Sequence, residues 1–474
     1  MKVIDQYENI RIVEREKNPV PLYVSEPYSF TASEAKLLAD HAKLLAEGEL
    51  DVVRREPDIE LRKQVITEYL RSKLPESKNK DQLIRSIINK VLGYGDISPF
   101  VDDPNLEEIM VNGVNIPVFV FHRKHGMCET DFRFATKADI LKIINRVCWV
   151  HNKDIKPIID LSAIDGSRLN FTMEPVTLHG PTLTLRKQRK HSFTISQLIN
   201  MGTMDSDIAA LLWLAVDGMR LSPANMVICG MVGSGKTSTL NALAMLTPPE
   251  ERIISIEETP EIRLDGKDNW IPLATSPELA MEDLVRNTLR MRPDKIIVGE
   301  VRGVEAMALF NAMNVGHRGM CTLHSTSPRE VIHRLQSPPM NVPLMVVTNL
   351  DLIVVENIFN IKGRPVRRIT EVAEVGGHEA DTILLGTIYE WDPSKDKAVE
   401  SDEMAPIAFL ETLAKKTKTS KKKVIRELNM RKAFLNKMIE HGIFDHEAVQ
   451  KAVNAFYREE KDIETIAAEE LAKK

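Results

Sequence analysis

The segment from Gly230 to Thr237 reads Gly-Met-Val-Gly-Ser-Gly-Lys-Thr and has the residue types that bind phosphate. It follows the apolar run MVIC and precedes a helical pattern, so we expect a loop between a strand and a helix. Glycines let backbone N–H groups turn toward phosphate oxygens, and the N-terminus of the helix adds positive charge. Lys236 can reach the outer phosphates of a nucleotide, and Thr237 can bind Mg²⁺. The predicted nucleotide-binding residues are Gly230, Gly233, Ser234, Gly235, Lys236, Thr237 and Ser238.

Three acids and one histidine end other apolar runs that are typical of buried strands. The run IIVGE ends in Glu300, which we predict to hold the metal ion together with Thr237. RIISIE leads into Glu257 and Glu258, either of which can orient or deprotonate an attacking water molecule. GMCTLH ends in His324, a position suited to sensing the outermost phosphate. The alternatives are a solvated acidic turn and a purely structural histidine.

These side chains need a sheet whose strands end at a common edge. From about Thr203 to Glu356, short apolar strands alternate with longer helical patterns, which predicts right-handed crossovers and a largely parallel, buried sheet. The expected strands are Asn225–Cys229, Arg252–Glu257, Lys295–Gly299, Gly319–His324 and Leu352–Glu356. The expected helices are Thr237–Leu246, Leu279–Met291, Val304–Val315 and Pro328–Gln336.

The texture of the sequence changes along the chain and suggests several regions. Helical spacing dominates the first hundred residues, hairpin-like strands follow, and the chain after the sheet region is charged and helical, with a basic peak at Lys415–Lys423. The boundaries we predict are 1–98 for a helical region, 99–190 for an α+β domain, 191–202 for a linker, 203–396 for the phosphate-binding domain and 397–474 for a charged helical C-terminal region.

Length and composition limit the class of protein. The 474 residues correspond to about three domains. Lys and Arg number 63 against 68 Asp and Glu, a net charge of -5, which argues against a general nucleic-acid coat. The longest apolar run, Ile208–Val216, is too short to span a membrane, and the first residues lack an apolar signal core. The four cysteines, which include no CxxC pair, are expected to be isolated buried thiols in a reducing cytoplasm.

The ordered set GMVGSGKTST, IEETPEIRL, LRMRPDKIIVGEVRG and GHRGMCTLHSTS resembles the type II/type IV secretion ATPase superfamily. That family calls these elements Walker A, Asp box, Walker B and His box. The upstream DPNLEEIMVNG, DGSRLNFT and GPTLTLRK are similar to its amino-terminal domain, so the resemblance covers about Pro99 to Pro393. GRPVRRITEVAEV and YEWDP resemble the archaeal branch, which includes archaellum motor ATPases and archaeal pilus ATPases.

The resemblance implies an α/β fold: a RecA-like P-loop ATPase domain, preceded by a helical plus α+β (PAS-like) N-terminal domain and followed by a helical C-terminal tail. It implies that Glu257 is the catalytic glutamate and Glu300 the Walker B glutamate. It also implies that Arg168 and Arg186 are arginine fingers, which the residues alone would mark as ordinary strand-end charges. Glu258 stands where the family commonly has Asp, so the choice between Glu257 and Glu258 stays open.

The function that the resemblance implies is a hexameric ATPase, with ATP and Mg²⁺, that drives assembly or motion of a type IV pilus-like filament or a related secretion machine. Its expected partners are further copies of the chain and a polytopic membrane platform protein at the cytoplasmic face. The basic stretch Lys415–Lys423 suits contact with anionic lipid or an acidic loop of a membrane partner, and the alternative, which the residues favour, is a solvated helix junction. One alternative is a nucleic-acid translocating ring ATPase, disfavoured by an aromatic content of 5% and the absence of a nucleic-acid motif. Another is a nucleotide-gated scaffold, disfavoured because the water-activating acids are present.

Overall fold

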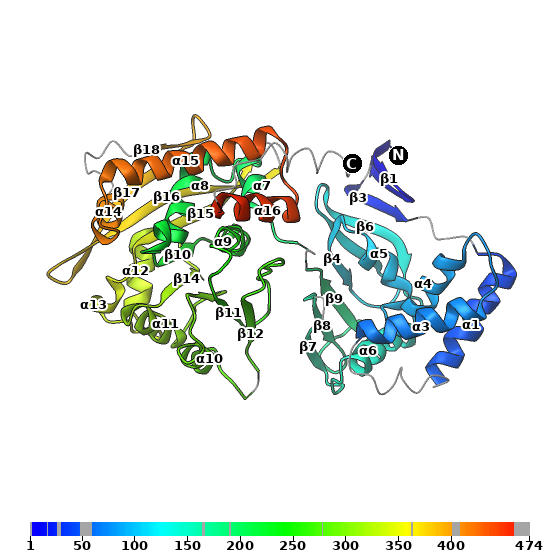
Figure 1. Cartoon of the computed structure of the whole chain (residues 1–474). Helices are drawn as coiled ribbons and strands as arrows, with labels where there is room; N and C mark the ends of the chain where they lie inside the picture. The colour runs from blue at the N-terminus through cyan, green and yellow to red at the C-terminus, as the bar shows by residue number, and fades with distance from the viewer. Residues whose placement is uncertain are drawn as a thin grey trace. The chain divides into compact units, whose positions relative to one another are not determined.

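The computed structural model describes residues 2–16, 18–25, 30–47, 59–163, 166–188, 191–276, 278–361, 364–400 and 408–458. The chain divides into an N-terminal unit, Met1–Arg189, and a C-terminal unit, Lys190–Lys474, each built around its own nine-stranded sheet (Figure 1). The expected α/β class is confirmed. Within the described residues, no helix combines the length and the apolar character that crossing a membrane requires.

The sheet of the N-terminal unit has the order β1-β2-β3-β6-β5-β4-β9-β8-β7 and is antiparallel except where β3 pairs with β6. Helix α6 packs in the same apolar core as the central strands through Ile140, Ile144 and Val147. The strands are β1 (Lys2–Tyr7), β2 (Ile10–Arg15), β3 (Asn18–Ser25), β4 (Leu106–Val111), β5 (Pro117–His122), β6 (Gly126–Arg133), β7 (Ile158–Ser162), β8 (Arg168–Thr172) and β9 (Thr182–Arg186). The helices are α1 (Ala32–Glu47), α3 (Ile59–Lys73), α4 (Lys80–Val91), α5 (Ser98–Asp102) and α6 (Lys137–Val150).

The first strands differ from the expected helical region at residues 1–98. Residues 2–25 form β1 to β3 instead of helices, because Ile10 and Ile12 alternate with polar residues and face the core. The hydroxyl groups of Tyr7 and Tyr23 each donate to Oδ2 of Asp103, at 2.8 Å, which ties these strands to the rest of the sheet. Helices α1, α3 and α4, which follow, share a separate apolar cluster.

The sheet of the C-terminal unit has the order β12-β11-β13-β14-β10-β15-β16-β17-β18. In this order, the first six strands, from β12 through β10 to β15, are parallel to one another. Strands β15, β16, β17 and β18 form an antiparallel extension. The strands are β10 (Met226–Cys229), β11 (Ile253–Glu257), β12 (Trp270–Ala274), β13 (Lys295–Val298), β14 (Arg318–Leu323), β15 (Leu352–Ile361), β16 (Arg364–Glu379), β17 (Thr382–Asp392) and β18 (Lys397–Glu400).

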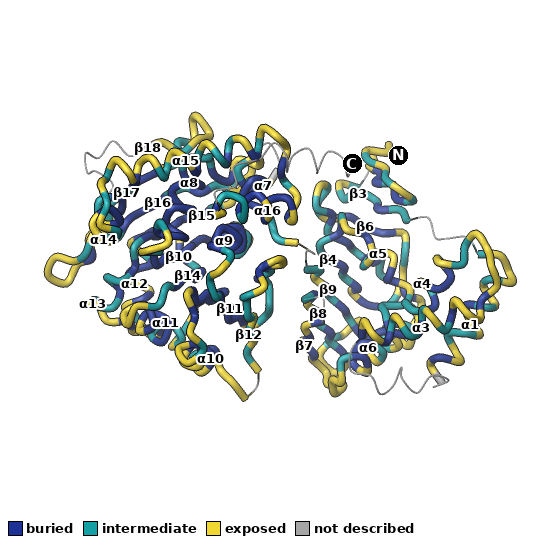
Figure 2. Tube along the Cα trace, in the orientation of Figure 1, coloured by how far each residue is buried: buried dark blue, intermediate teal, exposed yellow. Residues whose placement is uncertain are grey.

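Helices cover both faces of this sheet, because its central parallel strands carry apolar side chains on both faces. Met226 and Ile228 of β10 enter one apolar cluster, and Val227 and Cys229 enter the other. Figure 2 shows the buried centre in dark blue along β10, β15 and α9. The four cysteines are buried and free, as predicted. The helices are α7 (Ile195–Asn200), α8 (Ser206–Asp217), α9 (Lys236–Met245), α10 (Met281–Thr288), α11 (Glu305–Asn314), α12 (Pro328–Gln336), α13 (Leu344–Val347), α14 (Ala408–Lys416), α15 (Lys421–Glu440) and α16 (His446–Tyr457).

The helices after residue 408 belong to the core of the C-terminal unit and share one apolar cluster with α8. The longest apolar run, Ile208–Val216, lies in α8 and is completely buried among them. At the end of α8, Asp217 accepts from Nη2 of Arg431 on α15 at 2.6 Å, and both side chains are buried. The hydroxyl group of Tyr457 on α16 donates to the same carboxylate at 3.0 Å. These contacts bind the C-terminal helices to the sheet domain.

Two expected boundaries differ from the structure. Within the expected linker 191–202, α7 begins at a capping box formed by Thr194 and Gln197, and its Ile195 packs in the core of the C-terminal unit. The expected helical region 397–474 begins with β18, which pairs with β17. Residues 401–407 and 459–474 of that region lie outside the described residues.

Candidate functional site

The phosphate loop, Gly230–Thr237, leaves the carboxyl end of β10 and leads into α9. Gly233 and Gly235 have φ values of +77° and +112°, conformations that residues with a side chain rarely adopt. A Cβ atom on Gly230 would come within 2.0 Å of the carbonyl oxygen of Glu356. The two glycines with positive φ turn the backbone, and Gly230 allows its close approach to β15.

The side chain of Lys236 lies within this loop and is only 7% exposed. Its Nζ donates to the carbonyl oxygens of Gly230 and Met231, at 2.9 and 3.0 Å. Burial lowers the pKa of Lys236, while the nearby carboxylates of Glu300 and Glu356 act in the opposite direction. The ammonium group is therefore held inside the loop by backbone oxygens that an anionic ligand can replace.

A triphosphate fits the donors of this loop. The hydroxyl group of Ser234 is buried and has no hydrogen-bond partner among the described residues, so it is available to a bound oxygen. The loop leads into the N-terminus of α9, where unpaired backbone N–H groups favour an anion. Thr237 and Ser238 are partly exposed on the first turn of that helix.

Lys236, His324 and Glu300 form a continuous polar chain across three strand ends. Nζ of Lys236 lies 3.4 Å from Nδ1 of His324, and Nε2 of His324 lies 2.9 Å from Oε1 of Glu300. Burial and the charge of Lys236 lower the pKa of His324, whereas Glu300 raises it. The two ring nitrogens of His324 thus face a cation on one side and a carboxylate on the other.

Arg302 extends this chain to the acidic turn that follows β11. Its Nη2 donates to Oε2 of Glu300 at 2.6 Å, and its Nη1 lies 3.5 Å from Oε2 of Glu258. Burial would raise the pKa of Glu300, but the hydrogen bond from Arg302 and the charges of Arg302 and Lys236 act in the opposite direction, and the pKa is lowered. Glu300 is therefore held as a carboxylate.

The two acids of the acidic turn have different surroundings. Glu257 is 5% exposed, and its Oε1 accepts from the backbone N–H groups of Glu261 and Ile262 at 2.9 and 3.1 Å. Burial raises the pKa of Glu257 to about 7, despite those hydrogen bonds. Its Cγ packs against Gly299, where a Cβ would come within 2.7 Å. Glu258, in contrast, is exposed and pairs with Arg302.

Arg168 and Arg186 lie in the N-terminal unit, at cross-strand positions of β8 and β9. Both are exposed. On its other side, Arg186 lies opposite Glu108 of β4, so an acid stands next to this pair of like charges. Arg168 and Arg186 therefore lie side by side on neighbouring strands.

Four residues of the C-terminal unit that the sequence analysis did not single out contact the site. Asn241 of α9 donates to the carbonyl oxygens of Thr237 and Glu261, at 3.1 and 3.3 Å, and so joins the phosphate loop to the acidic turn. Its position one turn after Thr237 was the available signal. The other three are Arg302, Glu356 and Arg367.

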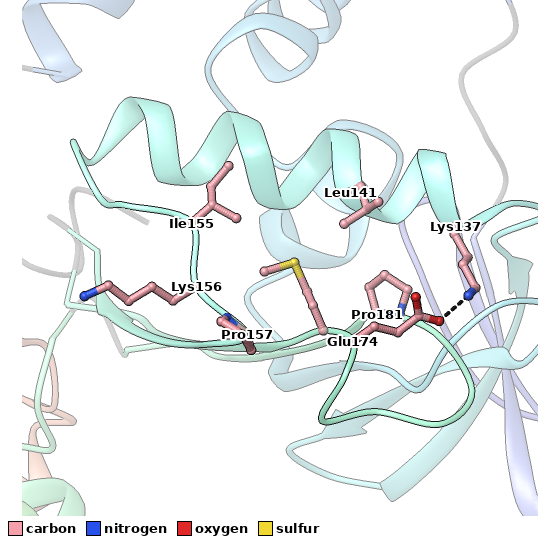
Figure 3. Close-up of a pocket in the computed structure, with 8 residues that line it drawn as sticks. Lys137, Leu141, Ile155, Lys156, Pro157, Glu174 and Pro181 are labelled. Atoms are coloured by element: carbon pink, nitrogen blue, oxygen red, sulfur yellow. Dashed lines mark hydrogen bonds and ion pairs between the residues drawn. The ribbon is translucent and has the colours of Figure 1, made fainter.

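A cavity of about 340 Å³ lies in the N-terminal unit, against α6. Figure 3 shows Leu141, Ile155 and Pro157 around it, with the ion pair between Lys137 and Glu174 at one side. None of the predicted site residues lines this cavity.

The sequence model of the type II/IV secretion system protein family matches residues 118–374. An uncharacterized protein of Methanocaldococcus jannaschii, MJ0900, is 34% identical over 82% of this chain and 71% of its own length. A second, MJ0781, is 40% identical over 67% of this chain, and the chain spans 45% of its length. The probable conjugal transfer protein TrbB of Sinorhizobium fredii is 30% identical over 58% of this chain and 85% of its own length.

Solved structures with a similar course of the chain include the Legionella pneumophila ATPase DotB, with 18% identity and a TM-score of 0.44 over 76% of this chain and 94% of DotB. The pilus retraction motor PilT with bound ADP has 15% identity and a TM-score of 0.44, over 75% of this chain and 96% of PilT. Likeness at these scores assigns no residue a role. The matched family model and the relative MJ0900 are sufficient by themselves: the chain belongs to the type II/IV secretion system protein family.

Proposed function

We propose that this protein is an ATPase of a type II/IV secretion or pilus-like machine. The observation that carries the proposal is the contact chain from Lys236 through His324 to Glu300, which places a cation, a polar sensor and a carboxylate beside the phosphate loop. ATP hydrolysis needs these three elements at one edge of a sheet.

The proposed nucleotide is ATP, bound with Mg²⁺ by Thr237 and Glu300. The described residues contain no group of three or more His, Cys, Asp or Glu side chains placed to hold a metal ion. The two proposed ligands, Thr237 and Glu300, suit Mg²⁺, which keeps several water molecules and binds one or two protein groups together with the phosphates. When bound, the ion neutralises charge on the phosphates. Lys236 exchanges its two carbonyl partners for phosphate oxygens as the loop fills.

We assign water activation to Glu257 rather than to Glu258. Glu257 is buried beside Gly299 of the Walker B segment, and its carboxyl group has a pKa of about 7, close to the value that suits a general base at neutral pH. Glu258 is exposed and contacts Arg302, so its proposed role is to position that guanidinium group.

Arg168 and Arg186 are proposed as arginine fingers. Their exposed cross-strand placement on β8 and β9 supports this proposal, because two guanidinium groups can stabilise charge on a transferring phosphoryl group. The ring in which they would act is a homo-hexamer. Closure of the N-terminal unit on the nucleotide is the proposed source of motion.

The proposed machine assembles or moves a type IV pilus-like filament, such as an archaellum or an archaeal pilus, or drives a related secretion process. The chain would act at the cytoplasmic face of a membrane, through a polytopic platform protein. Lys415, Lys418, Lys422 and Lys423, at the junction of α14 and α15, are exposed and suit contact with anionic lipid or an acidic loop.

The test is Mg²⁺-dependent phosphate release by the full chain, compared with Lys236→Ala. Turnover that disappears in the variant supports the proposal, whereas equal turnover in both proteins contradicts it. Single-stranded DNA and anionic vesicles are then added separately. Stimulation by DNA alone would favour a nucleic-acid translocase, and stimulation by vesicles that depends on Lys415–Lys423 supports the membrane assignment. Binding of ATP without any hydrolysis would favour a nucleotide-gated scaffold.

A further inference from the structure

Glu356 lies directly behind the phosphate loop and belongs to none of the sequence motifs. It follows Val355, the last residue of β15 that pairs with β10, at a point where the pairing with β16 shifts register. Its side chain is 1% exposed. Its carbonyl oxygen lies so close to Gly230 that no side chain fits there.

The carboxyl group of Glu356 is fixed on one side only. Oε2 accepts from Oγ1 of Thr239 at 2.9 Å, whereas Oε1 is buried and has no hydrogen-bond partner among the described residues. Oε1 faces Gly235, where a Cβ would come within 2.3 Å. Because Gly235 directly precedes Lys236 and α9, the carboxyl group sets how closely this end of the loop approaches β15.

Arg367 of β16 supports the same loop from the neighbouring strand. Its Nε donates to the carbonyl oxygen of Gly233 at 2.9 Å, and its Cδ lies 3.1 Å from a Cβ built on Gly235. The charged groups that face Glu356 are Arg367 from β16 and Lys236 from α9. Burial raises the pKa of Glu356 to about 7, while Thr239, Arg367 and Lys236 act in the opposite direction.

A negative charge on Glu356 opposes the binding of a negatively charged phosphate group in the loop. Phosphate bound by the loop would carry the same sign of charge as the Glu356 carboxylate, which is buried where little water screens the repulsion. Protonation of the buried carboxyl group removes that repulsion. The site therefore couples occupancy of the loop to the charge of Glu356.

We propose that Glu356 is a positioning residue of the phosphate loop, which supports Gly235 and Thr239 and takes up a proton from solvent when an anionic phosphate group fills the loop. The inference rests on the proposed nucleotide site, but it does not require hydrolysis. Glu356 acts through the loop rather than by contact with the substrate.

The experiment measures ADP binding with Mg²⁺ by calorimetry, using the full chain at several values between about pH 6 and pH 8.5. The variant is Glu356→Gln, which keeps the size and polarity of the side chain without its charge. The matched control is Glu371→Gln, since Glu371 also accepts from a threonine hydroxyl group, that of Thr387, and burial also raises its pKa. Comparison with wild type cancels the titration of ADP itself.

We expect wild type and Glu371→Gln to bind similarly and to lose affinity as the pH rises above 7, because the empty loop then carries a charged Glu356. The Glu356→Gln variant should lose less affinity for ADP over the same range. At about pH 8 it should therefore bind ADP up to about tenfold more tightly than wild type does. Binding by wild type, measured in buffers of different ionisation enthalpy, should take up more protons than binding by Glu356→Gln.

Parallel pH curves and equal proton uptake in wild type and Glu356→Gln would overturn the inference while leaving the nucleotide site intact. Absence of ADP binding by wild type would overturn the proposed function and the inference with it. A second variant, Thr239→Val, covers the case in which Glu356→Gln does not fold. Loss of this hydroxyl removes a contact that lowers the pKa of Glu356, so the fall in affinity should move to higher pH; an unmoved curve contradicts the inference.

Discussion

His324 and Glu300 meet at the ends of neighbouring strands, with Nε2 of the histidine 2.9 Å from Oε1 of the glutamate. The same histidine faces Lys236 through its other ring nitrogen. A change at the Walker B carboxylate therefore reaches the cation of the phosphate loop through one imidazole ring.

Lys236→Ala should abolish nucleotide binding, because it removes the buried cation that faces the loop carbonyls. Equilibrium binding of a fluorescent ADP analogue measures this loss. Lys432→Ala is the matched control, since Lys432 pairs with Asp207 on the surface of α15 and should bind like wild type. Normal binding by the Lys236 variant would refute the role of the loop.

His324→Ala should reduce the turnover number by roughly 10²-fold or more while changing nucleotide affinity little, because the ring links Lys236 to Glu300 without filling the loop. His324→Gln should keep part of the activity, as an amide can still bridge. Since the pKa of His324 is lowered, its ring should be less protonated near pH 6.5 than an ordinary histidine, which is half protonated there. Steady-state kinetics at several pH values would test this, and a variant with unchanged turnover would contradict it.

Glu257→Gln should lose far more hydrolysis than Glu258→Gln. If Glu257 is the general base, its pKa of about 7 makes the wild-type rate rise with pH through neutrality, since only the carboxylate accepts a proton. Single-turnover phosphate release compares the two variants. The reverse order of activities would transfer the role to Glu258.

Arg168→Ala should keep nucleotide binding and lose most hydrolysis, as expected of a group that stabilises only the transition state. Arg133→Ala is the control, because Arg133 is an exposed arginine at the end of another strand of the same unit. Binding and turnover are measured separately for both. Full hydrolysis by the Arg168 variant would remove the arginine-finger assignment.

Arg431→Met should lower the free energy of unfolding by about 3–5 kcal/mol, because it leaves the carboxylate of Asp217 buried without its cation. Adding Asp217→Asn to this variant should restore much of the loss, since no charge is then left uncompensated. Chemical denaturation followed by tryptophan fluorescence reports directly on this region, where Trp213 donates to the hydroxyl group of Tyr457. A much smaller fall in the free energy of unfolding would contradict the predicted contribution of the buried pair of Arg431 and Asp217.

Much of the C-terminal unit was predictable because its signals are local. The runs that form β10, β11, β13 and β14 are largely apolar, so their strands and the residues at their ends follow from the order of residues alone. Strands β1 to β3 were not expected, since they are short and gain stability from pairing with each other and with β6. Strand β12 was missed for a similar reason, as it lies at the edge of its sheet.

The order of residues was enough to identify the phosphate loop, the acids and the histidine, because glycines at fixed spacing and polar residues after apolar runs indicate their chemistry locally. Which of these groups touch depends on the folded arrangement of the strands. It joined Glu300 to His324 and Arg302, separated buried Glu257 from exposed Glu258, and brought Glu356 and Arg367 behind the loop. The contacts of Glu356 and Arg367 with the loop join residues more than a hundred positions apart in the chain. They form only when crossover connections bring distant strand ends to one edge of the sheet.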